Sequence, residues 1–303
     1  MSERHAGSSV PSWAPEDGTG DLGQNGGMSL GQFTPRPGDA VTGAMVAGLV
    51  GVAPELVEFV WRNDNGGLTF RYRAARQDQP TYLTWLPARL RGLGEKARAR
   101  AAWVAPYVPV PVFSELREGL GGVWMTSAAL PGDSAVGPWG KAHPEAAVRA
   151  IATGLRRLHD GAPAASCPFT WDIRARADAV RCAVATGGCW RQAPDDYLAS
   201  WSTKRAYEVL TRGCALAPDP VVCHGDPCAP NTVLSPATGA FVGLVDLGDL
   251  GVADRWADLA IASWSLGWNY GPGWEPLFFD TYGAVPDPRR IAFYRLLGAA
   301  PTG

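Results

Sequence analysis

The stretch Val221-Val-Cys-His-Gly-Asp-Pro-Cys-Ala-Pro-Asn231 opens the part of the chain that decides the fold. Its β-branched start predicts a short strand that delivers the following residues to a loop. On that loop Asp226 and Asn231 lie five residues apart. A polar turn then leads into a second apolar strand, Phe241 to Val245, which ends on Asp246. The pattern therefore predicts two adjoining strands that bring a carboxylate, an amide and a second carboxylate together.

Those three side chains are the groups that phosphoryl transfer requires. The reaction needs an aligned nucleophile and a neutralised phosphate charge more than it needs covalent help. Mg²⁺ prefers oxygen ligands and usually takes one or two of them from the protein. We predict that Asn231 and Asp246 bind Mg²⁺, that Asp226 is the catalytic base for the acceptor hydroxyl, and that His224 braces the loop. The alternative is a hairpin with solvated acids, which the combined spacing disfavours.

With these motifs in place, the segment 221–297 resembles the aminoglycoside phosphotransferase family. The resemblance is strong over the last half of the chain and weak over the first half. The sequence of the catalytic loop most resembles that of the branch acting on streptomycin and kanamycin-type sugars. The matching residues are His224-Gly-Asp226-Pro-Cys-Ala-Pro-Asn231, Asp246-Leu-Gly248, Gly251-Val-Ala-Asp254-Arg255-Trp-Ala-Asp258-Leu-Ala and Arg290-Ile-Ala-Phe-Tyr-Arg-Leu-Leu297.

The resemblance implies an α+β, two-lobed protein-kinase-like fold, with a small antiparallel-sheet N-lobe and a mostly helical C-lobe. It also implies a phosphotransferase with an alcohol group as acceptor, which uses ATP and Mg²⁺ on a small-molecule antibiotic. Residues 1–36 are rich in Gly, Pro and Ser and predict a disordered leader. We expect a nucleotide-binding lobe over 37–132 and a catalytic and acceptor-binding lobe over 133–303.

Composition excludes several other classes of protein. The net charge of −2 predicts no nucleic-acid partner, and the most apolar stretch is broken by glycines and a proline, which predicts no membrane span. The six cysteines show no paired or metal-ligating spacing. Without a signal peptide, that usage predicts reduced thiols and a cytoplasmic location. The oligomeric state stays open.

A glycine turn precedes the phosphoryl-transfer motifs by about half the chain. The runs on either side of Gly66 and Gly67 predict two strands, and such a turn allows backbone amides to approach nucleotide phosphates. An ordinary β-hairpin is the alternative. Further strands are predicted over Thr81–Pro87, Val108–Phe113 and Gly122–Ser127.

The third strand departs from the family pattern. The resemblance implies a phosphate-binding lysine at the position of Thr84, and none of the chain's three lysines lies on this strand. Its partner glutamate is expected at Glu95. Either an arginine such as Arg71 or Arg73 substitutes, or nucleotide binding is weaker, or the register differs. Arginine is an imperfect replacement because its charge is spread over a planar, forked guanidinium group, whereas the charge of a lysine is compact.

The resemblance also implies a hinge after the strand 122–127, where the Ala128 carbonyl and the Leu130 amide would read the adenine edge. Three other polar residues are predicted to be structural. We expect His159 to be a packing residue, Asp254 to pair locally with Arg255, and Asp258 to anchor the catalytic loop.

The expected acceptor site lacks the carboxylates that a polycationic aminoglycoside needs. The helix after the Mg²⁺ loop carries Trp264, Trp268 and Tyr270 instead, and Asp249 stands where relatives commonly have arginine. These four residues are candidates for acceptor binding. Burying ammonium groups without countercharges is costly, whereas stacking a sugar or planar ring on Trp is favourable. The alternative is that the aromatic residues belong to the core.

Three functions therefore stay open. The first is an antibiotic kinase for a weakly charged acceptor, such as a nucleoside antibiotic of the capuramycin type. The second is an ordinary aminoglycoside kinase of the streptomycin type, with acids supplied from residues 172–213. The third is a kinase-like binding protein without turnover, which the intact catalytic triplet disfavours. The acids considered for the second are Asp172, Asp178, Asp195 and Asp196.

Overall fold

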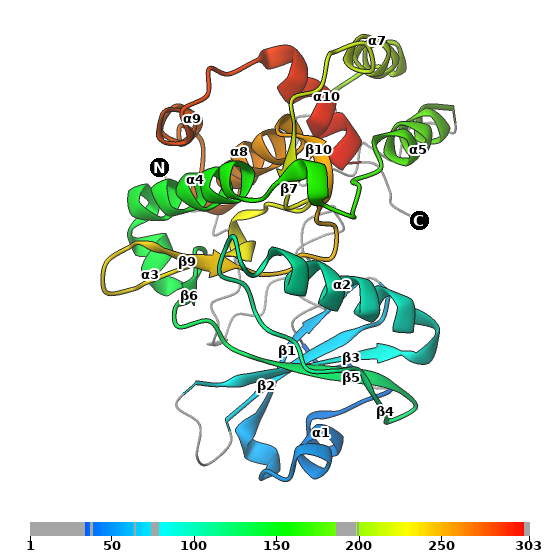
Figure 1. The fold of residues 1–303 in the computed structure, drawn as a ribbon, viewed down its shortest axis with the longest axis vertical. Helices are drawn as coiled ribbons and strands as arrows, with labels where there is room; N and C mark the ends of the chain where they lie inside the picture. The colour runs from blue at the N-terminus through cyan, green and yellow to red at the C-terminus, as the bar shows by residue number, and fades with distance from the viewer. Residues whose placement is uncertain are drawn as a thin grey trace, which may run out of the picture.

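The computed structural model of the chain describes residues 34–36, 39–63, 65–73, 79–185, 198 and 200–299. An antiparallel sheet forms the N-terminal part and helices dominate the C-terminal part (Figure 1). This arrangement confirms the predicted fold class. The predicted leader lies almost wholly outside the described residues. The lobe boundary after residue 132 coincides with the start of the short strand β6 at Asp133, and we retain it as a proposal.

A five-stranded antiparallel sheet builds the N-terminal lobe. Alternate residues of its strands, such as Leu68, Phe70, Leu83 and Trp85, are buried on one face. This period of two is what a half-buried strand requires. The strand order is β1 (Val57–Arg62), β2 (Leu68–Tyr72), β3 (Thr81–Pro87), β5 (Gly122–Ala128) and β4 (Arg117–Gly119).

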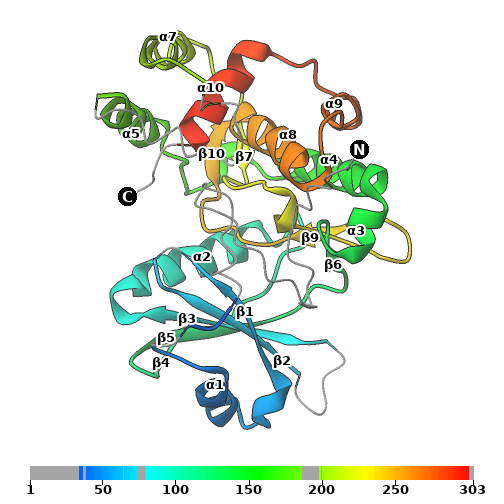
Figure 2. The same ribbon diagram turned by 180° about the vertical axis from the view of Figure 1, so that it is seen from behind.

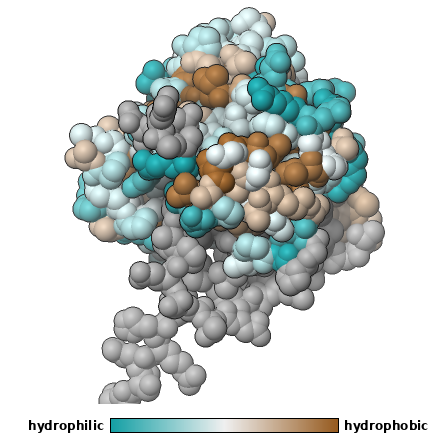
Figure 3. Space-filling view, turned by 90° about the horizontal axis from the view of Figure 1, so that it is seen from below, coloured by the Kyte–Doolittle hydropathy of each residue, from teal (hydrophilic) through white to brown (hydrophobic). Residues whose placement is uncertain are grey.

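Helix α1 (Gly43–Val50) covers the buried face of this sheet, at the end of the molecule remote from the C-terminal lobe (Figure 2). It begins at Thr42, whose hydroxyl caps the Met45 amide, and ends on Gly51 in the left-handed conformation. Figure 3 views this end and shows apolar patches among polar residues. Met45 is one of the exposed large apolar side chains of the described chain. The helix therefore leaves some apolar surface outside.

Helix α2 (Arg91–Val104) lies between the sheet and the C-terminal lobe (Figure 1). Its buried residues Gly94, Ala101 and Val104 follow helical spacing. The far end of the helix packs into a cluster with Val222 and Leu244 from the C-terminal lobe. One helix therefore contacts both the N-terminal sheet and the strands that carry the motifs.

The strand predicted over Val108–Phe113 does not form a ladder. Within the described residues, its sheet pairing is limited to an isolated bridge between Phe113 and Ser127. Two prolines explain the difference, because each removes a backbone donor. The segment is still important: Val108 and Val110 are buried, and the Pro109 carbonyl accepts the Leu244 amide at 3.0 Å.

Two small antiparallel sheets in the C-terminal lobe hold the motif loops. One pairs β7 (Pro220–Cys223) with β10 (Gly251–Asp254), and the other has the order β6 (Asp133–Ser134), β8 (Thr232–Leu234), β9 (Phe241–Leu244). Both strands predicted around the motifs are therefore present, within one residue of the expected ends.

Helices enclose these sheets, and their apolar faces form the largest buried cluster of the described chain. Helix α4 supplies several fully buried residues to it, including Ile151 and Leu155. No helix of the described residues is long and apolar enough to cross a membrane. The helices are α3 (Pro138–Ala142), α4 (Pro144–Gly161), α5 (Ile173–Ala185), α7 (Thr203–Gly213), α8 (Trp256–Tyr270), α9 (Glu275–Tyr282) and α10 (Pro288–Gly298).

Candidate active site

Strand pairing brings two loops side by side. The first loop, residues 224–231, joins β7 to β8, and the second loop, residues 245–250, joins β9 to β10. The antiparallel pairs β7–β10 and β8–β9 fix both ends of this arrangement. The Val245 amide also donates to the Asn231 carbonyl at 2.9 Å. The backbone therefore holds the loops together without help from the reactive side chains.

Within the first loop, Asn231 is oriented by Asp226. The Asn231 Nδ2 group donates to the Asp226 carbonyl at 2.9 Å and lies 3.4 Å from the Asp226 Oδ2 atom. The nitrogen side of the amide is held there, and within the described residues its oxygen accepts no hydrogen bond, so that it can bind a cation. The structure thus brings together the two residues that the sequence spacing predicted.

His224 braces the loop as expected. Its Nδ1 atom accepts the Asp226 amide at 3.3 Å, so the neutral ring carries its proton on Nε2, which donates to the Val245 carbonyl at 2.9 Å. The residue is fully buried. One imidazole therefore links the first loop to the residue before Asp246.

Asp246 has an unusual backbone conformation and a raised side-chain pKa. Its φ of 59° lies in the left-handed region, which non-glycine residues rarely adopt. The residue as a whole is exposed, yet many protein atoms surround its carboxylate. This burial, and secondly the neighbouring Asp226 carboxylate, raise the pKa of Asp246 to about 6. Two nearby carboxylates are a setting that favours a bound cation.

The available donors fit Mg²⁺. A carboxylate from Asp246 and an amide oxygen from Asn231 are hard oxygen ligands, and two protein ligands suffice when phosphates and water supply the rest. We retain the assignment of these two residues to Mg²⁺, and of Asp226 to the base, as proposals.

A buried network supports the first loop from below. The Asp258 carboxylate accepts the His224 amide at 2.6 Å and the Gly225 amide at 3.0 Å. It also lies 2.9 Å from His159 Nε2, and the other nitrogen of that ring lies 2.7 Å from the Tyr282 hydroxyl. Asp258 therefore anchors the loop, and His159 is structural, as predicted. Tyr282, on α9, had no signal in the sequence.

His159, Cys223 and Asp258 lie close enough together to suggest a metal site. The hydrogen bonds argue against one, because they already use the histidine and both carboxylate oxygens. Burial, and then the Asp258 charge, raise the pKa of the Cys223 thiol well above its usual value. A thiolate ligand is therefore disfavoured, and the cluster is a structural brace.

The expected pairing of Asp254 with Arg255 is wrong. Asp254 pairs instead with Arg290 of α10, and its Oδ1 atom accepts the Trp256 amide at 3.1 Å. Arg255 pairs with Asp219. Adjacent residues on a strand end point in different directions, so each charge finds a partner from elsewhere in the chain.

The glycine turn forms a tight hairpin end. Gly66 has a φ of 85°, and its amide donates to the Asn63 carbonyl at 3.0 Å. The Gly67 amide donates to Asn63 Oδ1 at 2.7 Å. A side chain on Gly67 would meet Asn63 and Leu86. Both amides therefore have internal partners, and phosphate binding by Gly66 and Gly67 stays a prediction.

Thr84 lies on β3, paired with Thr69 and Met125, and its match to the family's lysine position stays a prediction. The glutamate predicted to pair with a charge at this position does not face β3. Glu95 lies on the exposed side of α2, 4.0 Å from Arg91, because the inward positions of this helix are those of Gly94 and Ala101. This placement does not support the predicted partnership of Glu95 with a phosphate-binding cation.

Arg71 is one of the two arginines, with Arg73, considered as a replacement for the lysine. It pairs with Glu58, at 2.9 Å from its Nε atom, and lies opposite Tyr82 on the neighbouring strand. The hinge residue Ala128 is opposite Thr81 at the same end of β3. Arg71 therefore lies nearer the hinge than Thr84 does, which does not favour it as a phosphate ligand.

The segment predicted to be the hinge begins at the end of β5. Ala128 is exposed, and the Ala129 amide after it donates to the Pro80 carbonyl at 2.9 Å. The Leu130 carbonyl accepts the Gly132 amide at 2.9 Å. This turn carries the chain from β5 to β6. Adenine recognition by Ala128 and Leu130 stays a prediction.

The aromatic acceptor candidates lie mainly in packing positions. Trp264 is buried with 4% exposure, and its ring centroid lies 4.8 Å from that of Trp268, which is half-buried. The Tyr270 hydroxyl donates to the Ala135 carbonyl at 2.7 Å. These contacts favour the core alternative for Trp264 above all, and an acceptor role for the three residues stays a prediction.

Asp249 has a specific partner. Its Oδ2 atom lies 3.1 Å from Arg176 Nη2 on α5, and the Arg176 guanidinium stacks over Trp171 at 4.4 Å. The Asp249 backbone packs closely on Gly225, which has a φ of 90°. Asp249 is thus an exposed carboxylate beside the first loop, already paired with a cation.

Two of the other four acids considered for acceptor binding lie in the described residues. Asp172 caps α5 by accepting the Arg174 and Ala175 amides, and Asp178 pairs with Arg181. Asp195 and Asp196 lie outside the described residues. Ser265 was not predicted from the sequence; its hydroxyl accepts the Ala229 amide at 2.9 Å and so ties α8 to the first loop.

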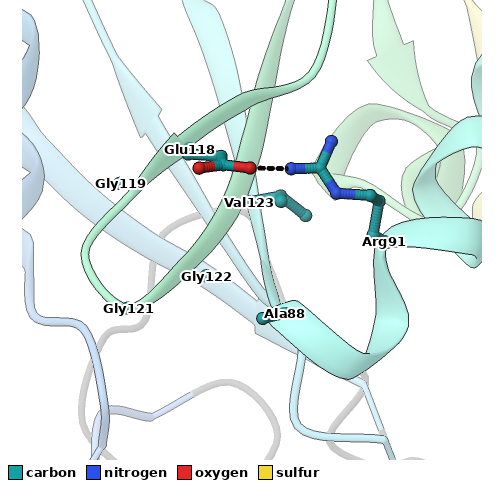
Figure 4. A pocket seen from close by; sticks show the side chains of 7 residues that line it. All are labelled: Ala88, Arg91, Glu118, Gly119, Gly121, Gly122 and Val123. Atoms are coloured by element: carbon teal, nitrogen blue, oxygen red, sulfur yellow. Dashed lines mark hydrogen bonds and ion pairs between the residues drawn. The ribbon is translucent and has the colours of Figure 1, made fainter.

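A pocket of about 400 Å³ lies elsewhere, between the β4–β5 turn and the start of α2 (Figure 4). The Arg91–Glu118 ion pair spans it. Its lining includes none of the residues predicted for catalysis, and it lies at the end of β5 opposite the hinge. We therefore place the candidate active site at the two loops. The lining residues are Ala88, Arg91, Glu118, Gly119, Gly121, Gly122 and Val123.

Known proteins resemble the chain over both the N-terminal sheet and the C-terminal helices. The sequence profile of the phosphotransferase enzyme family matches residues 62–294. The streptomycin 3''-kinase of Streptomyces griseus is 34% identical over 279 residues, which are 83% of this chain and 94% of that protein.

Two solved structures share the fold. An aminoglycoside-3'-phosphotransferase of type VIII is 27% identical with a TM-score of 0.66, over 80% of this chain and 93% of that one. An aminoglycoside phosphotransferase from Streptomyces rimosus, in complex with ADP and streptomycin, is 27% identical with a TM-score of 0.61, over 78% and 93%. The chain therefore belongs to the aminoglycoside phosphotransferase family and is a phosphotransferase that acts on a hydroxyl group.

Proposed function

We propose that this protein inactivates an aminoglycoside of the streptomycin type by ATP-dependent phosphorylation of a sugar hydroxyl. The observation that carries the proposal is the convergence of Asp226, Asn231 and Asp246 on two paired loops. The choice of acceptor rests on the relatives: one is named streptomycin 3''-kinase, and another was solved with ADP and streptomycin.

Each residue of the centre has a distinct task in this proposal. Asp226 orients the acceptor hydroxyl and accepts its proton as the γ-phosphoryl group moves in line. Asn231 and Asp246 hold Mg²⁺, which when bound neutralises the phosphate charge. His224 and Asp258 keep the loop backbone rigid, because they bind its amides. Rigid positioning accounts for much of the rate enhancement in this reaction class.

The nucleotide is proposed to lie between the sheet and the two loops, with the adenine near Ala128 and Leu130. The lack of a lysine at Thr84 leaves the phosphates with less positive charge from β3 than the family pattern supplies. We therefore expect a nucleotide affinity that depends strongly on Mg²⁺.

A weakly charged acceptor, such as a capuramycin-type nucleoside antibiotic, is the second candidate. One observation favours it: Asp249, an exposed carboxylate beside the first loop, is already neutralised by Arg176. An acceptor with several ammonium or guanidinium groups would have to compete for that carboxylate. Stacking on Trp268, which is half-buried, would suit a planar or sugar ring.

The deciding experiment is mass spectrometry of acceptors after incubation with the protein and MgATP. The panel contains streptomycin, a kanamycin-type aminoglycoside and a capuramycin-type nucleoside antibiotic, and the Asp226→Asn protein is the blank. Addition of one phosphoryl group to streptomycin supports the proposal. Modification of the nucleoside alone would replace it with the second candidate, and product formation by the Asp226→Asn protein would refute the assignment of the base.

A further inference from the structure

Helix α2 makes a direct contact with the second loop. Arg100, one turn before the end of this helix, donates a hydrogen bond from Nη1 to the backbone carbonyl of Gly248. The two residues are 148 positions apart in sequence. Figures 1 and 2 show α2 lying across the space between the sheet and the C-terminal strands. Arg100 is thus a link from the nucleotide-side lobe to the loop that carries Asp246.

The surroundings of Arg100 fix the direction of its side chain. The guanidinium lies over the Phe169 ring at 5.5 Å, and that ring packs edge-on against Trp103 of the same helix. The Phe169 carbonyl accepts the Val252 amide at 2.9 Å, which ties this ring to β10. Within the described residues the buried Arg100 Nε atom has no hydrogen-bond partner. Because an unpaired buried donor is destabilising, stability alone does not explain an arginine here.

Gly248 lies directly beside the proposed metal ligand. A Cβ atom built on Gly248 would be 3.8 Å from Asp246 Oδ1, so its backbone adjoins the carboxylate. Asp246 itself has the left-handed φ of 59°. Such a conformation persists only when its surroundings hold it. Leu247 and Leu250 anchor the loop in the apolar cluster that includes the end of α2, and Arg100 holds the polar backbone between them.

Within the described residues, no ion pair joins β3 to α2 at the two positions where the resemblance implies one. Thr84 carries no charge, and Glu95 lies on the exposed side of the helix beside Arg91. The connection from α2 to the proposed centre therefore runs through its C-terminal half. We propose that Arg100 is a positioning residue that couples α2 to the second loop and holds the Asp246 carboxylate where the Mg²⁺ of the nucleotide binds.

This inference rests on the proposed function, but its test needs no acceptor. Three variants are compared with the wild type: Arg100→Met removes the donors, Arg100→Lys keeps the charge without the planar fork, and Arg98→Met changes an arginine two positions earlier on α2. Calorimetric titration measures the Kd of a non-hydrolysable ATP analogue with Mg²⁺ and with EDTA. Thermal melting of each protein is recorded alongside.

We expect Arg100→Met to raise the Kd at saturating Mg²⁺ about tenfold and to change the Kd in EDTA less than twofold, whereas Arg98→Met changes neither. Arg100→Lys should fall between wild type and Arg100→Met. Equal losses of affinity with and without Mg²⁺, or a lower Tm with an unchanged Mg²⁺ dependence, would show that Arg100 only stabilises the fold.

Arg100→Lys carries the same test if Arg100→Met does not fold, and a wild-type Mg²⁺ dependence in that variant would overturn the inference. Failure of the wild-type protein to bind the analogue would overturn both this inference and the proposed function. Failure to phosphorylate any acceptor, with Mg²⁺-dependent nucleotide binding intact, would count against the proposed acceptor only.

Discussion

Arg176 and Asp249 form an ion pair between α5 and the second loop, with Nη2 and Oδ2 3.1 Å apart. The arginine side chain is only 14% exposed and stacks on Trp171, whereas the aspartate side chain is 55% exposed. The cation is therefore fixed, and the carboxylate is exposed to solvent on a residue whose backbone packs on Gly225. If the acceptor binds beside the first loop, as we propose, this pair sets how much negative charge the acceptor meets there.

Releasing that carboxylate should favour a cationic acceptor. In Arg176→Gln, Asp249 becomes free to bind a guanidinium or ammonium group, so the KM for streptomycin should fall about two- to fivefold, as for an exposed ion pair. Steady-state kinetics would measure it. Asp249→Asn should matter little in the wild type and should cancel the gain in the Arg176→Gln background. A higher streptomycin KM in Arg176→Gln, unaffected by Asp249→Asn, would instead mean that Arg176 positions α5.

Asp246 should make the protein sensitive to pH. Its pKa in the folded protein is about 6, above the ordinary value of 3.8, so folding favours the protonated carboxyl. The stability that this proton contributes is fully present below pH 3.8 and is lost as the pH rises through about 6. In EDTA, Asp246→Asn should therefore gain Tm relative to wild type between pH 5 and pH 7. Melting curves at both values test this, with Asp178→Asn as an exposed control.

The same pKa predicts the pH dependence of Mg²⁺ binding. Since the metal needs the ionised carboxylate, the Mg²⁺ dependence of nucleotide affinity should weaken as the pH falls through about 6. Titrations at pH 5.5 and 7.5 would measure the change. An equal Mg²⁺ dependence at both values would argue that Asp246 is not a metal ligand.

The two loops could be predicted from the local sequence. The strands, the turn and the spacing of the polar residues all lie within about 30 consecutive residues. Contacts between distant residues were not accessible in this way: the Arg176–Asp249 pair spans 73 positions. Glu95 shows a different limit. Its position in the sequence suited a family glutamate, but the phase of α2 turns Gly94 and Ala101 inward and leaves Glu95 exposed.

Thr84 offers a gain-of-function test. It lies on β3 between Thr69 and Met125, at the position where the resemblance implies a lysine. Thr84→Lys should keep activity equal or raise it, with a KM for ATP lower by up to about fivefold, the effect of about 1 kcal/mol from one added charge. Thr84→Met adds similar bulk without charge and should show no gain. A collapse of activity in both variants would give Thr84 a role of its own.

The two tryptophans of α8 should separate packing from acceptor binding. Trp264 is 96% buried and its ring contacts Trp268 and the Arg295 guanidinium, 5.8 Å away. Trp264→Ala should therefore lower the free energy of unfolding by about 3–5 kcal/mol, as expected for a buried aromatic residue, and leave the acceptor KM unchanged in the folded fraction. Denaturant titration and steady-state kinetics measure the two effects.

Trp268 is half-buried and should lose less stability in Trp268→Ala. A rise in its acceptor KM at unchanged ATP KM would place its ring at the acceptor, because a core residue would affect both substrates alike. Trp268→Phe is the matched control, since it keeps an aromatic face and should retain most of the affinity. If neither variant moves the acceptor KM while both lower the Tm, the ring belongs to the core and the acceptor is bound by other residues, with Asp249 the first to test.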